Sequence, residues 1–451
     1  MKMLSIFVIG AIMAISSCKS KQEAERSGPS PHVDWSRNAT IYEVNIRQYT
    51  PLGTFKAFER ELPRLQKMGV DILWLMPINP LGQKNRKGSL GSYYSVADYF
   101  AVNPEYGTKQ DFIELVKKAH ELGMKVIIDW VANHTSWDNP LITKHPEWYK
   151  KDSAGNIVAP VADWTDVAAL DYSQPGLREY MGDALAYWIK EADIDGYRCD
   201  VAGMLPVDFW NQAIPEIRKI KPIFMLAEEE TPKMHDTAFD ATYSWGLFHV
   251  MNGIAKKKKG ADKIDSLFAA ESKLYPADAF RMRFTSNHDE NSWNGTEYER
   301  MGAGARTFAV FTFTFPGIPL VYSGQESAMN RRLRFFDKDT IPWGNYPLES
   351  FYSALMKLKK TNDLIASGES GGQFIKIATG NDKAIYAFLR KKENRRLFVV
   401  LNFSDADQKT QFKGSEFTGK YQELFTGRKI EFKADDKITL TPWQYLVYLS
   451  E

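Results

Sequence analysis

The segment Asp195-Gly196-Tyr197-Arg198-Cys199-Asp200 shows most clearly how this chain is organised. Its apolar and aromatic residues are typical of a buried strand, and charged residues stand at its end. The apolar spacing of residues 177–192, just before it, predicts an amphipathic helix. A helix that leads into a buried strand is one repeat of a parallel sheet with crossover helices.

The same unit recurs along the chain. Further strands are predicted at residues 41–46, 70–75, 125–129, 223–228, 239–243, 281–287 and 318–322, and further helices at 54–68 and 111–122. This pattern favours a closed (β/α)8 TIM barrel of the α/β class over an open sheet. Residues 135–175 interrupt the pattern and predict a short insertion after strand 3, for which we expect an open cleft.

The pattern changes near the C-terminus. Segments with the apolar pattern of strands, at 384–389, 397–401 and 445–449, lie between turns rich in Gly, Asn and Asp. This pattern predicts a small antiparallel β domain. We therefore expect a catalytic barrel over residues 35–365 and a C-terminal β domain over residues 366–451.

The N-terminus predicts export and a lipid anchor. Lys2 is followed by an apolar run over residues 4–15, which is too short for a permanent membrane span. Ile15-Ser16-Ser17-Cys18 resembles a bacterial lipoprotein signal. We expect a signal peptide at residues 1–17, a lipid on Cys18, a flexible tether over 18–34 and a cell-envelope location. Cys199 is the only other cysteine, so an acylated Cys18 leaves no intrachain disulfide.

The overall charge argues against a nucleic-acid partner. The 451 residues carry a formal net charge of +2, and the run at 256–259 is a short solvated lysine cluster. We expect a monomer without an organic cofactor.

Acidic residues gather where the predicted strands end. Residues 129–134, 198–200, 228–230 and 287–290 follow strands 3, 4, 5 and 7, and each segment contains at least one carboxylate. The C-terminal ends of barrel strands face a shared pocket. The sequence therefore predicts a site built on several carboxylates.

These segments resemble the four signature segments of the α-amylase superfamily, glycoside hydrolase family thirteen. Residues 129–134, 196–200, 224–228 and 284–289 match them in order and separation, and residues 91–99 resemble the segment after strand 2. The resemblance covers the chain from about residue 35 to the C-terminus. It implies a retaining glycosidase, in which a nucleophile and an acid/base lie about 5–5.5 Å apart.

The resemblance assigns the catalytic roles. It makes Asp200 the nucleophile, Glu228 the acid/base and Asp289 the residue that stabilises the transition state. Glu229 and Glu230 compete for the acid role, and the register of the segment favours Glu228. We expect crowding by carboxylates to raise the pKa of Glu228.

The resemblance also names the residues that bind the sugar. Tyr94 would stack beneath the ring, His134 and His288 would donate hydrogen bonds to it, and Asp129 would orient its neighbours. Arg198 lies two residues before Asp200 on the same side of the strand, so we expect it to lower the pKa of that carboxyl.

The resemblance also implies a calcium site, and the sequence departs from the family pattern at one place. Asn133 and Asp171 resemble ligands of a Ca²⁺ ion that ties the insertion to the barrel in many relatives. Gly203-Met204 stands where many α-amylases have a Lys-His pair on the leaving-group side. The loss of those side chains leaves the leaving-group preference open, although the Met204 carbonyl could serve a metal.

The expected function is hydrolysis of α-1,4 bonds in starch or maltooligosaccharides. Two alternatives remain at this point: a relative that acts on α-1,6 bonds or transfers sugars, and an inactive glycan-binding lipoprotein.

Overall fold

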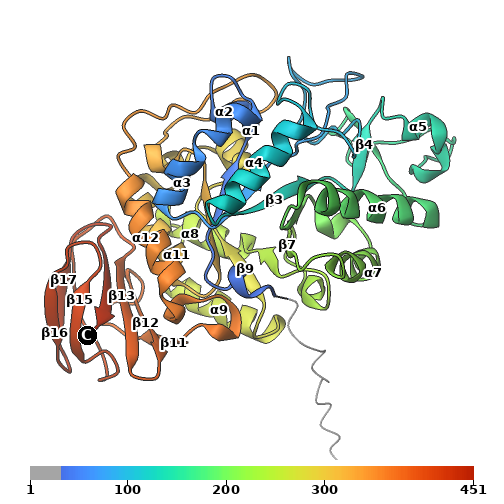
Figure 1. Cartoon of the computed structure of the whole chain (residues 1–451). Coiled ribbons are helices and arrows are strands. Elements are labelled where there is room, and N and C mark those ends of the chain that lie inside the picture. The colour runs from blue at the N-terminus through green and yellow to red at the C-terminus, as the bar shows by residue number, and fades with distance from the viewer. Residues whose placement is uncertain (1–31) are drawn as a thin grey trace, which may run out of the picture. The chain divides into compact units, whose positions relative to one another are not determined.

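The computed structural model describes residues 32–451, and its centre is a closed barrel of parallel strands (Figure 1). The signal peptide, Cys18 and most of the tether predicted from the sequence lie outside the described residues. Around the barrel the strands are ordered β1-β10-β9-β8-β7-β6-β3-β2. Their bounds are Ile41–Val44 (β1), Ile72–Leu75 (β2), Lys125–Trp130 (β3), Gly196–Cys199 (β6), Phe224–Ala227 (β7), Ala241–Tyr243 (β8), Phe280–Arg283 (β9) and Ile318–Tyr322 (β10). The prediction of a (β/α)8 barrel is confirmed.

Helices surround the barrel strands, apart from α5, which lies in the insertion after β3. Their bounds are Ile46–Tyr49 (α1), Phe55–Glu59 (α2), Leu62–Met68 (α3), Lys109–Glu121 (α4), Leu141–Lys144 (α5), Pro175–Ala192 (α6), Val207–Arg218 (α7), Trp245–Ala255 (α8), Asp262–Leu274 (α9), Glu297–Met301 (α10), Ala305–Thr314 (α11) and Glu349–Thr361 (α12). The helix expected over residues 54–68 is two helices, α2 and α3. Pro63 lies in the first turn of α3, where its missing N–H costs no hydrogen bond.

The barrel is filled by apolar side chains that point inward. Ile72, Trp74, Ile127, Phe224 and Leu226 belong to this inner cluster, and none of them is exposed. Branched and aromatic residues in these positions are typical of a packed barrel core. Such a core fixes the strand ends, and with them the polar residues that follow.

One glycine allows two of the catalytic strands to meet. A Cβ atom on Gly196 would lie 1.8 Å from the carbonyl oxygen of Phe224, and the φ of Gly196 is +146°. Only glycine fits such a close approach. It aligns β6 with β7, which precede Asp200 and Glu228.

The insertion after β3 is short. It contains the antiparallel pair His134–Ser136 (β4) and Val167–Ala169 (β5), with α5 between them. Tyr99 Oη donates to the carbonyls of Val131 and His134, at 2.8 and 3.0 Å, and so fixes the exit from β3. The insertion therefore starts from a well-anchored position at the rim of the barrel.

The C-terminal part consists of antiparallel sheets. A six-stranded sheet has the order β11-β12-β13-β18-β15-β16, and β14 pairs with β17. The bounds are Gln373–Ile377 (β11), Ile385–Lys392 (β12), Arg395–Asn402 (β13), Gln408–Gln411 (β14), Gly419–Glu423 (β15), Lys429–Phe432 (β16), Lys437–Leu440 (β17) and Tyr445–Ser450 (β18). The predicted C-terminal antiparallel fold is therefore confirmed.

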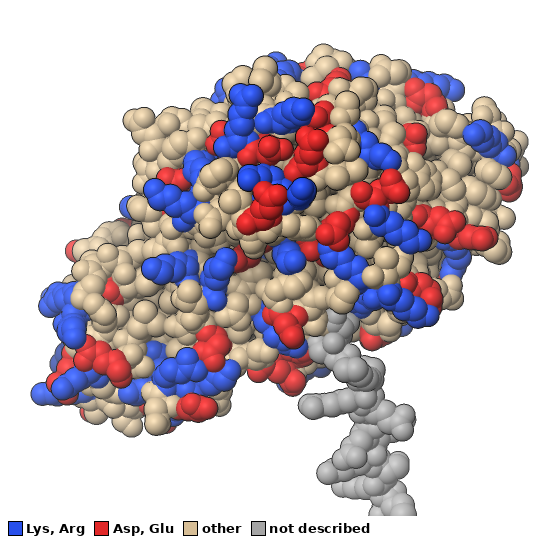
Figure 2. All heavy atoms as spheres, viewed as in Figure 1, with Lys and Arg blue, Asp and Glu red and all other residues tan. Residues whose placement is uncertain are grey.

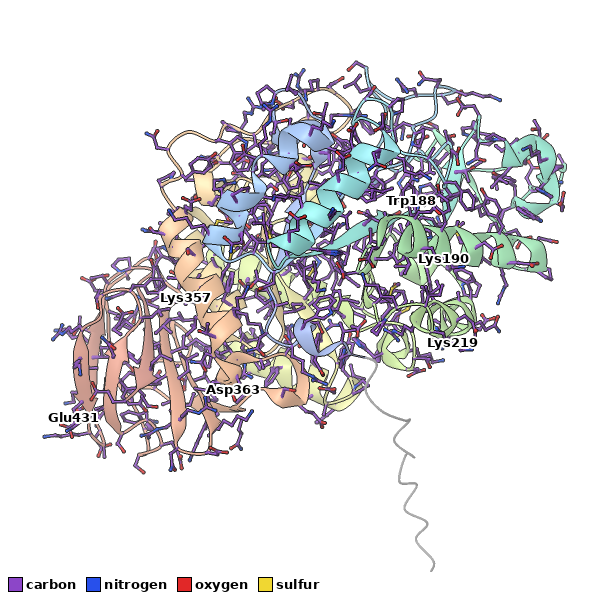
Figure 3. All side chains as sticks on the ribbon, viewed as in Figure 1. Trp188, Lys190, Lys219, Lys357, Asp363 and Glu431 are labelled. Carbon is purple, nitrogen blue, oxygen red and sulfur yellow. The ribbon has the colours of Figure 1, made fainter. Side chains whose placement is uncertain are left out.

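Aromatic and ionic contacts join the last helices to this sheet. Phe308 stacks on Phe403 with ring centroids 4.8 Å apart. Asp363, labelled in Figure 3, follows α12 and pairs with Arg395 at 2.7 Å and with Lys392 at 3.0 Å. Acidic and basic side chains are interspersed on the face drawn in Figure 2. No helix within residues 32–451 is long and apolar enough to cross a membrane.

Candidate active site

A buried arginine binds the carboxylates at the mouth of the barrel. Nη1 of Arg198 lies 2.8 Å from Asp129 Oδ1 and 3.1 Å from Asp200 Oδ1, and its Nη2 lies 2.8 Å from Glu228 Oε2. The Arg198 side chain is fully buried. Residues from β3, β6 and β7 therefore converge on one cation, as the sequence predicted from the strand ends.

The electrostatic environment of Asp200 differs from the expectation. Burial and then the Glu228 carboxylate raise the pKa of Asp200 well above its ordinary value, although Arg198 acts in the opposite direction. Arg198 lowers this pKa as predicted, but burial and Glu228 outweigh its effect. A single positive charge is shared among several carboxylates, and it does not offset their desolvation and mutual repulsion. Burial likewise raises the pKa of Asp129, to about 6.

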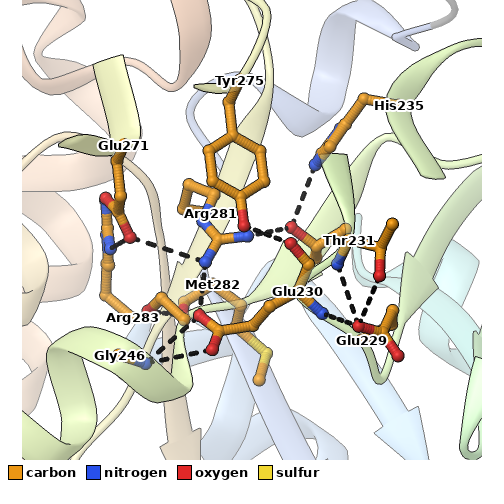
Figure 4. Close-up of polar contacts among 12 residues, drawn as sticks. Glu229, Glu230, Thr231, His235, Gly246, Glu271, Tyr275, Arg281, Met282 and Arg283 are labelled. Atoms are coloured by element: carbon orange, nitrogen blue, oxygen red, sulfur yellow. Dashed lines mark hydrogen bonds and ion pairs between the residues drawn. The ribbon is translucent and has the colours of Figure 1, made fainter. Parts of the chain in front are cut away.

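Glu228 is the glutamate of its segment that faces the pocket. Its Oε2 accepts a hydrogen bond from the backbone N–H of Val201 at 2.8 Å. The Glu229 carboxylate instead accepts hydrogen bonds from the N–H groups of Glu230 and Thr231, at 2.7 and 2.9 Å (Figure 4).

Glu230 is also engaged elsewhere. Its Oε1 lies 2.6 Å from Nη2 of Arg281, and both of its carboxylate oxygens accept from the N–H of Gly246 at the start of α8 (Figure 4). These contacts agree with the register that favoured Glu228 for the acid role.

A chain of hydrogen bonds links the residues on the opposite side of the pocket. Tyr94 Oη donates to Asp129 Oδ2 at 3.1 Å and lies 2.8 Å from His288 Nε2. His288 Nδ1 lies 2.5 Å from Glu43 Oε1, and His288 Nε2 lies 3.3 Å from Asp289 Oδ2. The predicted residues Tyr94, Asp129, His288 and Asp289 thus form one connected network.

Charge fixes the protonation of His288 and Asp289. Burial lowers the pKa of His288, but the Asp289 and Glu43 carboxylates outweigh it and raise this pKa well above its usual range. Desolvation raises the pKa of Asp289, but the neighbouring imidazolium outweighs it and holds this pKa below its ordinary value. The pocket therefore presents an ionised Asp289 and a cationic His288.

His134 contributes a neutral ring. Burial lowers its pKa to about 4. It lines the pocket, and Trp164 of the insertion meets it edge-on, with ring centroids 5.5 Å apart. A neutral imidazole has one donor and one acceptor nitrogen, and Nδ1 lies 3.2 Å from Nδ2 of Asn133, so Nδ1 accepts and Nε2–H is the donor.

The pocket measures about 570 Å³, within the usual range for small-molecule sites. The lining residues that the sequence analysis had not singled out as site residues are Lys87, Ser92, Asp163, Trp164, Asp166, Val167, Val201, Trp293, Phe335 and Phe336. Most of them come from loops without a hydrophobic period, where sequence patterns are least informative. Glu43, which holds His288, was missed although a charged residue within an apolar strand segment is a usable signal.

The two predicted calcium ligands border a separate pocket. Asn133, Asp171 and Met204 line it together with Lys150 and Arg178. Asp171 Oδ1 already accepts from the N–H of Ser173 at 3.0 Å, and Nδ2 of Asn133 lies 3.9 Å from Met204 Sδ.

Ca²⁺ takes about 6–8 oxygen ligands, which can include backbone and Asn carbonyls as well as carboxylates. One carboxylate, that of Asp171, faces a space that two cationic side chains also line. Within residues 32–451, no group of three or more His, Cys, Asp and Glu side chains is placed to hold a metal. The calcium site stays a prediction that these side chains do not favour.

The departure at Gly203 has a steric counterpart. A Cβ atom on Gly203 would lie 1.7 Å from Glu229 Oε2. The Glu229 carboxylate therefore occupies the space that a side chain at this position would need.

Comparison with known proteins agrees with this geometry. The model of the alpha-amylase catalytic domain matches residues 33–165 and 160–386. The chain belongs to the α-amylase family. The model of the maltogenic amylase C-terminal domain matches residues 375–447 of this α-amylase family member. The predicted enzyme class, a glycoside hydrolase, is confirmed.

Several relatives are similar over most of this chain. It is 32% identical to a noncanonic maltogenic alpha-amylase from Thermotoga neapolitana, with a TM-score of 0.85 and coverage of 92% of this chain and 99% of that one. An alpha-amylase from Lactobacillus plantarum is also 32% identical, with a TM-score of 0.83 and coverage of 92% and 100%. Alpha-amylase 2 from Dictyoglomus thermophilum is 26% identical over 87% of this chain and 73% of that protein. The match to alpha-amylase MalA from Haloarcula japonica covers 56% of that protein.

Proposed function

We propose that this glycoside hydrolase cleaves α-1,4 glucosidic bonds of maltooligosaccharides or starch with retention of configuration. The binding of Asp129, Asp200 and Glu228 by the single guanidinium of Arg198, at the floor of an aromatic-lined pocket, carries this proposal. Retaining glycosidases need two carboxyl groups about 5–5.5 Å apart, and shared contact with one guanidinium, which brings Asp200 and Glu228 close together, supports such a pair.

The reaction has two steps. In the first, a carboxylate oxygen of Asp200 attacks the anomeric carbon while the Glu228 carboxyl gives its proton to the departing glycosidic oxygen. A covalent glycosyl ester on Asp200 forms, and the shortened chain leaves. In the second, Glu228 takes a proton from water as the water oxygen attacks the same carbon and releases Asp200.

The two catalytic carboxyl groups must carry one proton between them when the first step begins. Burial and the neighbouring Glu228 carboxylate raise the pKa of Asp200. The mechanism needs that proton on Glu228. Arg198 contacts both groups and would stabilise the negative charge on Asp200.

The network opposite Glu228 would hold the sugar. Positive charge develops on the ring in the transition state, and the ionised Asp289 is suited to stabilise it through the sugar hydroxyls. The ring nitrogens of the cationic His288 face Glu43 on one side and Tyr94 and Asp289 on the other, so His288 would act by keeping Asp289 ionised. Tyr94 is fixed by Asp129 and His288, so its ring is preorganised as a stacking surface.

The test is a product time course. Purified enzyme is incubated with maltoheptaose, starch, pullulan and a cyclomaltodextrin, and the products are separated by chromatography. We expect shorter maltooligosaccharides from maltoheptaose and no release by Asp200→Asn. Products from pullulan alone would favour α-1,6 action, products longer than the substrate would indicate sugar transfer, and binding without any turnover would favour the inactive glycan-binding alternative.

We also propose that the protein is a monomeric cell-envelope lipoprotein, anchored through Cys18. The apolar run followed by Ile15-Ser16-Ser17-Cys18 supports this proposal. Full-length protein expressed in a bacterium should enter the detergent phase of a Triton X-114 extraction, whereas Cys18→Ser should stay in the aqueous phase. Equal partitioning of the two forms would refute the anchor. Light scattering of the protein without residues 1–31 tests the monomer.

A further inference from the structure

Residues 87–90 connect two walls of the active-site pocket, and we call them the bridging segment. They belong to the loop between β2 and α4. On one side, Lys87 Nζ donates to the carbonyl oxygen of Asp163 at 2.5 Å and pairs with Asp166 Oδ1 at 3.2 Å. Both partners belong to the insertion after β3, so the lysine joins the bridging segment to the insertion.

On its other side, the bridging segment meets the loop after β10. The N–H of Leu90 donates to the carbonyl oxygen of Phe336 at 2.9 Å. The N–H and Oγ of Ser89 both donate to Asp337 Oδ1, at 3.0 and 2.5 Å. A Cβ atom on Gly88 would lie 2.5 Å from Cβ of Phe336, and the φ of Gly88 is +59°. Two loops that are distant in sequence are therefore in direct contact.

The topology of the barrel places this wall opposite the acid/base. In the closed strand order, β1 is four positions from β7 in either direction. The bridging segment follows β2 and its partner loop follows β10, and these two strands flank β1. Glu228 follows β7. The wall therefore lies across the mouth of the barrel from the residue that protonates the leaving group.

Aromatic side chains line the inner face of this wall. Trp293, about half exposed, lies with its ring centroid 5.3 Å from that of Phe335 and 5.7 Å from that of Phe336. All three line the pocket together with Lys87. Such rings can stack on sugar faces, and the lysine can donate to a hydroxyl. The wall is thus a binding surface as well as a barrier.

From these contacts we propose that the bridging segment closes the glycone end of the cleft, so that the enzyme acts from the non-reducing ends of glucan chains and releases short products. This inference rests on the proposed function. The acid/base protonates the leaving oxygen, so the leaving sugars extend on the side of Glu228 and the non-reducing end faces the wall. The sequence had led us to expect an open cleft because the insertion is short. The insertion reaches Lys87, however, and the whole pocket, at about 570 Å³, has room for only a few sugar rings.

The test compares free maltoheptaose with maltoheptaose whose non-reducing glucose carries a 4,6-O-ethylidene group. Early products of the free chain should be dominated by one short sugar of fixed length. The blocked chain should be cleaved at least about tenfold more slowly, because a closed pocket rejects an added group by ~10–200-fold. Equal rates and mixed products from both chains would overturn the inference while leaving the proposed function intact. If neither chain is cleaved, the proposed function fails and the inference fails with it.

A pair of variants locates the barrier. Lys87→Ala removes the side chain that spans from the bridging segment to the insertion, and it should lower the ratio of free to blocked rates by at least about threefold. Lys84→Ala is the matched control, since Lys84 is an exposed lysine of the same loop and does not line the pocket. It should keep the ratio of the wild type. An unchanged ratio in Lys87→Ala, or an equal drop in both variants, would overturn the role of Lys87 as the barrier.

Discussion

The replacement Glu228→Gln provides a sharp test of the catalytic assignment. The side chain keeps its size, and the amide oxygen can still accept the hydrogen bond that Val201 N–H donates at 2.8 Å. What it loses is the proton for the leaving group. The variant therefore removes chemistry with little change in packing.

The expected loss follows from the role of a general acid. Positioned proton transfer contributes about 10²–10⁴-fold to rate. This corresponds to roughly 2.7–5.4 kcal/mol of transition-state stabilisation. We therefore expect kcat/KM for maltotriose to fall by about 10²–10⁴-fold, mainly through kcat.

The assay uses two substrates that differ in their leaving group. Fluoride leaves without a proton, so in the first turnover Glu228→Gln should release fluoride from α-maltosyl fluoride within about tenfold of the wild-type rate, while the second step, in which Glu228 acts as base, slows later turnovers. Glu229→Gln is the matched control, because that carboxylate is held by the N–H groups of Glu230 and Thr231, away from the pocket. It should retain near wild-type rates on both substrates.

The result that would refute the reasoning is a loss of equal size on maltotriose and maltosyl fluoride. It would show that Glu228 acts before or apart from proton donation, for example by fixing Arg198. A large loss on maltotriose alone in Glu229→Gln, with none in Glu228→Gln, would move the acid role to Glu229.

Further predictions concern the surroundings of the same site. Burial and then the Glu228 carboxylate raise the pKa of Asp200. Glu228→Gln removes that carboxylate and should lower the pKa of Asp200, so the acid limb of the pH–rate profile on maltosyl fluoride should shift to lower pH. A shift to higher pH would contradict this sign. Tyr94→Phe removes the hydroxyl that donates to Asp129. Leaving a buried acceptor without this donor costs ~1–3 kcal/mol, so kcat/KM for maltotriose should fall about 5–150-fold. An unchanged kcat/KM would exclude a positioning role for the hydroxyl. Arg198→Met leaves buried carboxylates without their cation and should lower the free energy of unfolding by about 3–5 kcal/mol in urea titrations; a change below about 1 kcal/mol would contradict this. Removal of calcium with EDTA should change neither activity nor melting temperature, because two cationic side chains line the pocket assigned to the ion, and a drop that added Ca²⁺ reverses would restore the calcium prediction.

Much of the fold could be predicted from local patterns. Most barrel strands are short, largely apolar runs buried on both faces, and their hydrophobicity is visible in the sequence alone. The strand expected at 281–287 is instead Phe280–Arg283, in which two of four residues are arginines. The single helix expected at 54–68 was wrong, because two short helices with a break between them have nearly the same apolar spacing as one. The expected roles of Asp200, Glu228 and Asp289, which follow β6, β7 and β9, came from the resemblance of their segments to those of the family.

The sequence by itself determined the barrel, the C-terminal sheets and the residue types at the strand ends, since all of these depend on neighbours along the chain. Only the tertiary structure decided how the charges balance. Arg198 lies two residues from Asp200 and lowers its pKa, yet burial and the Glu228 carboxylate, which follows another strand, outweigh Arg198 and raise that pKa. The shape of the cleft was likewise decided by contacts across long sequence distances, from Lys87 to Asp163 and from Ser89 to Asp337. Desolvation and loop contacts depend on what surrounds a residue in space, and for that reason no local pattern could reveal them.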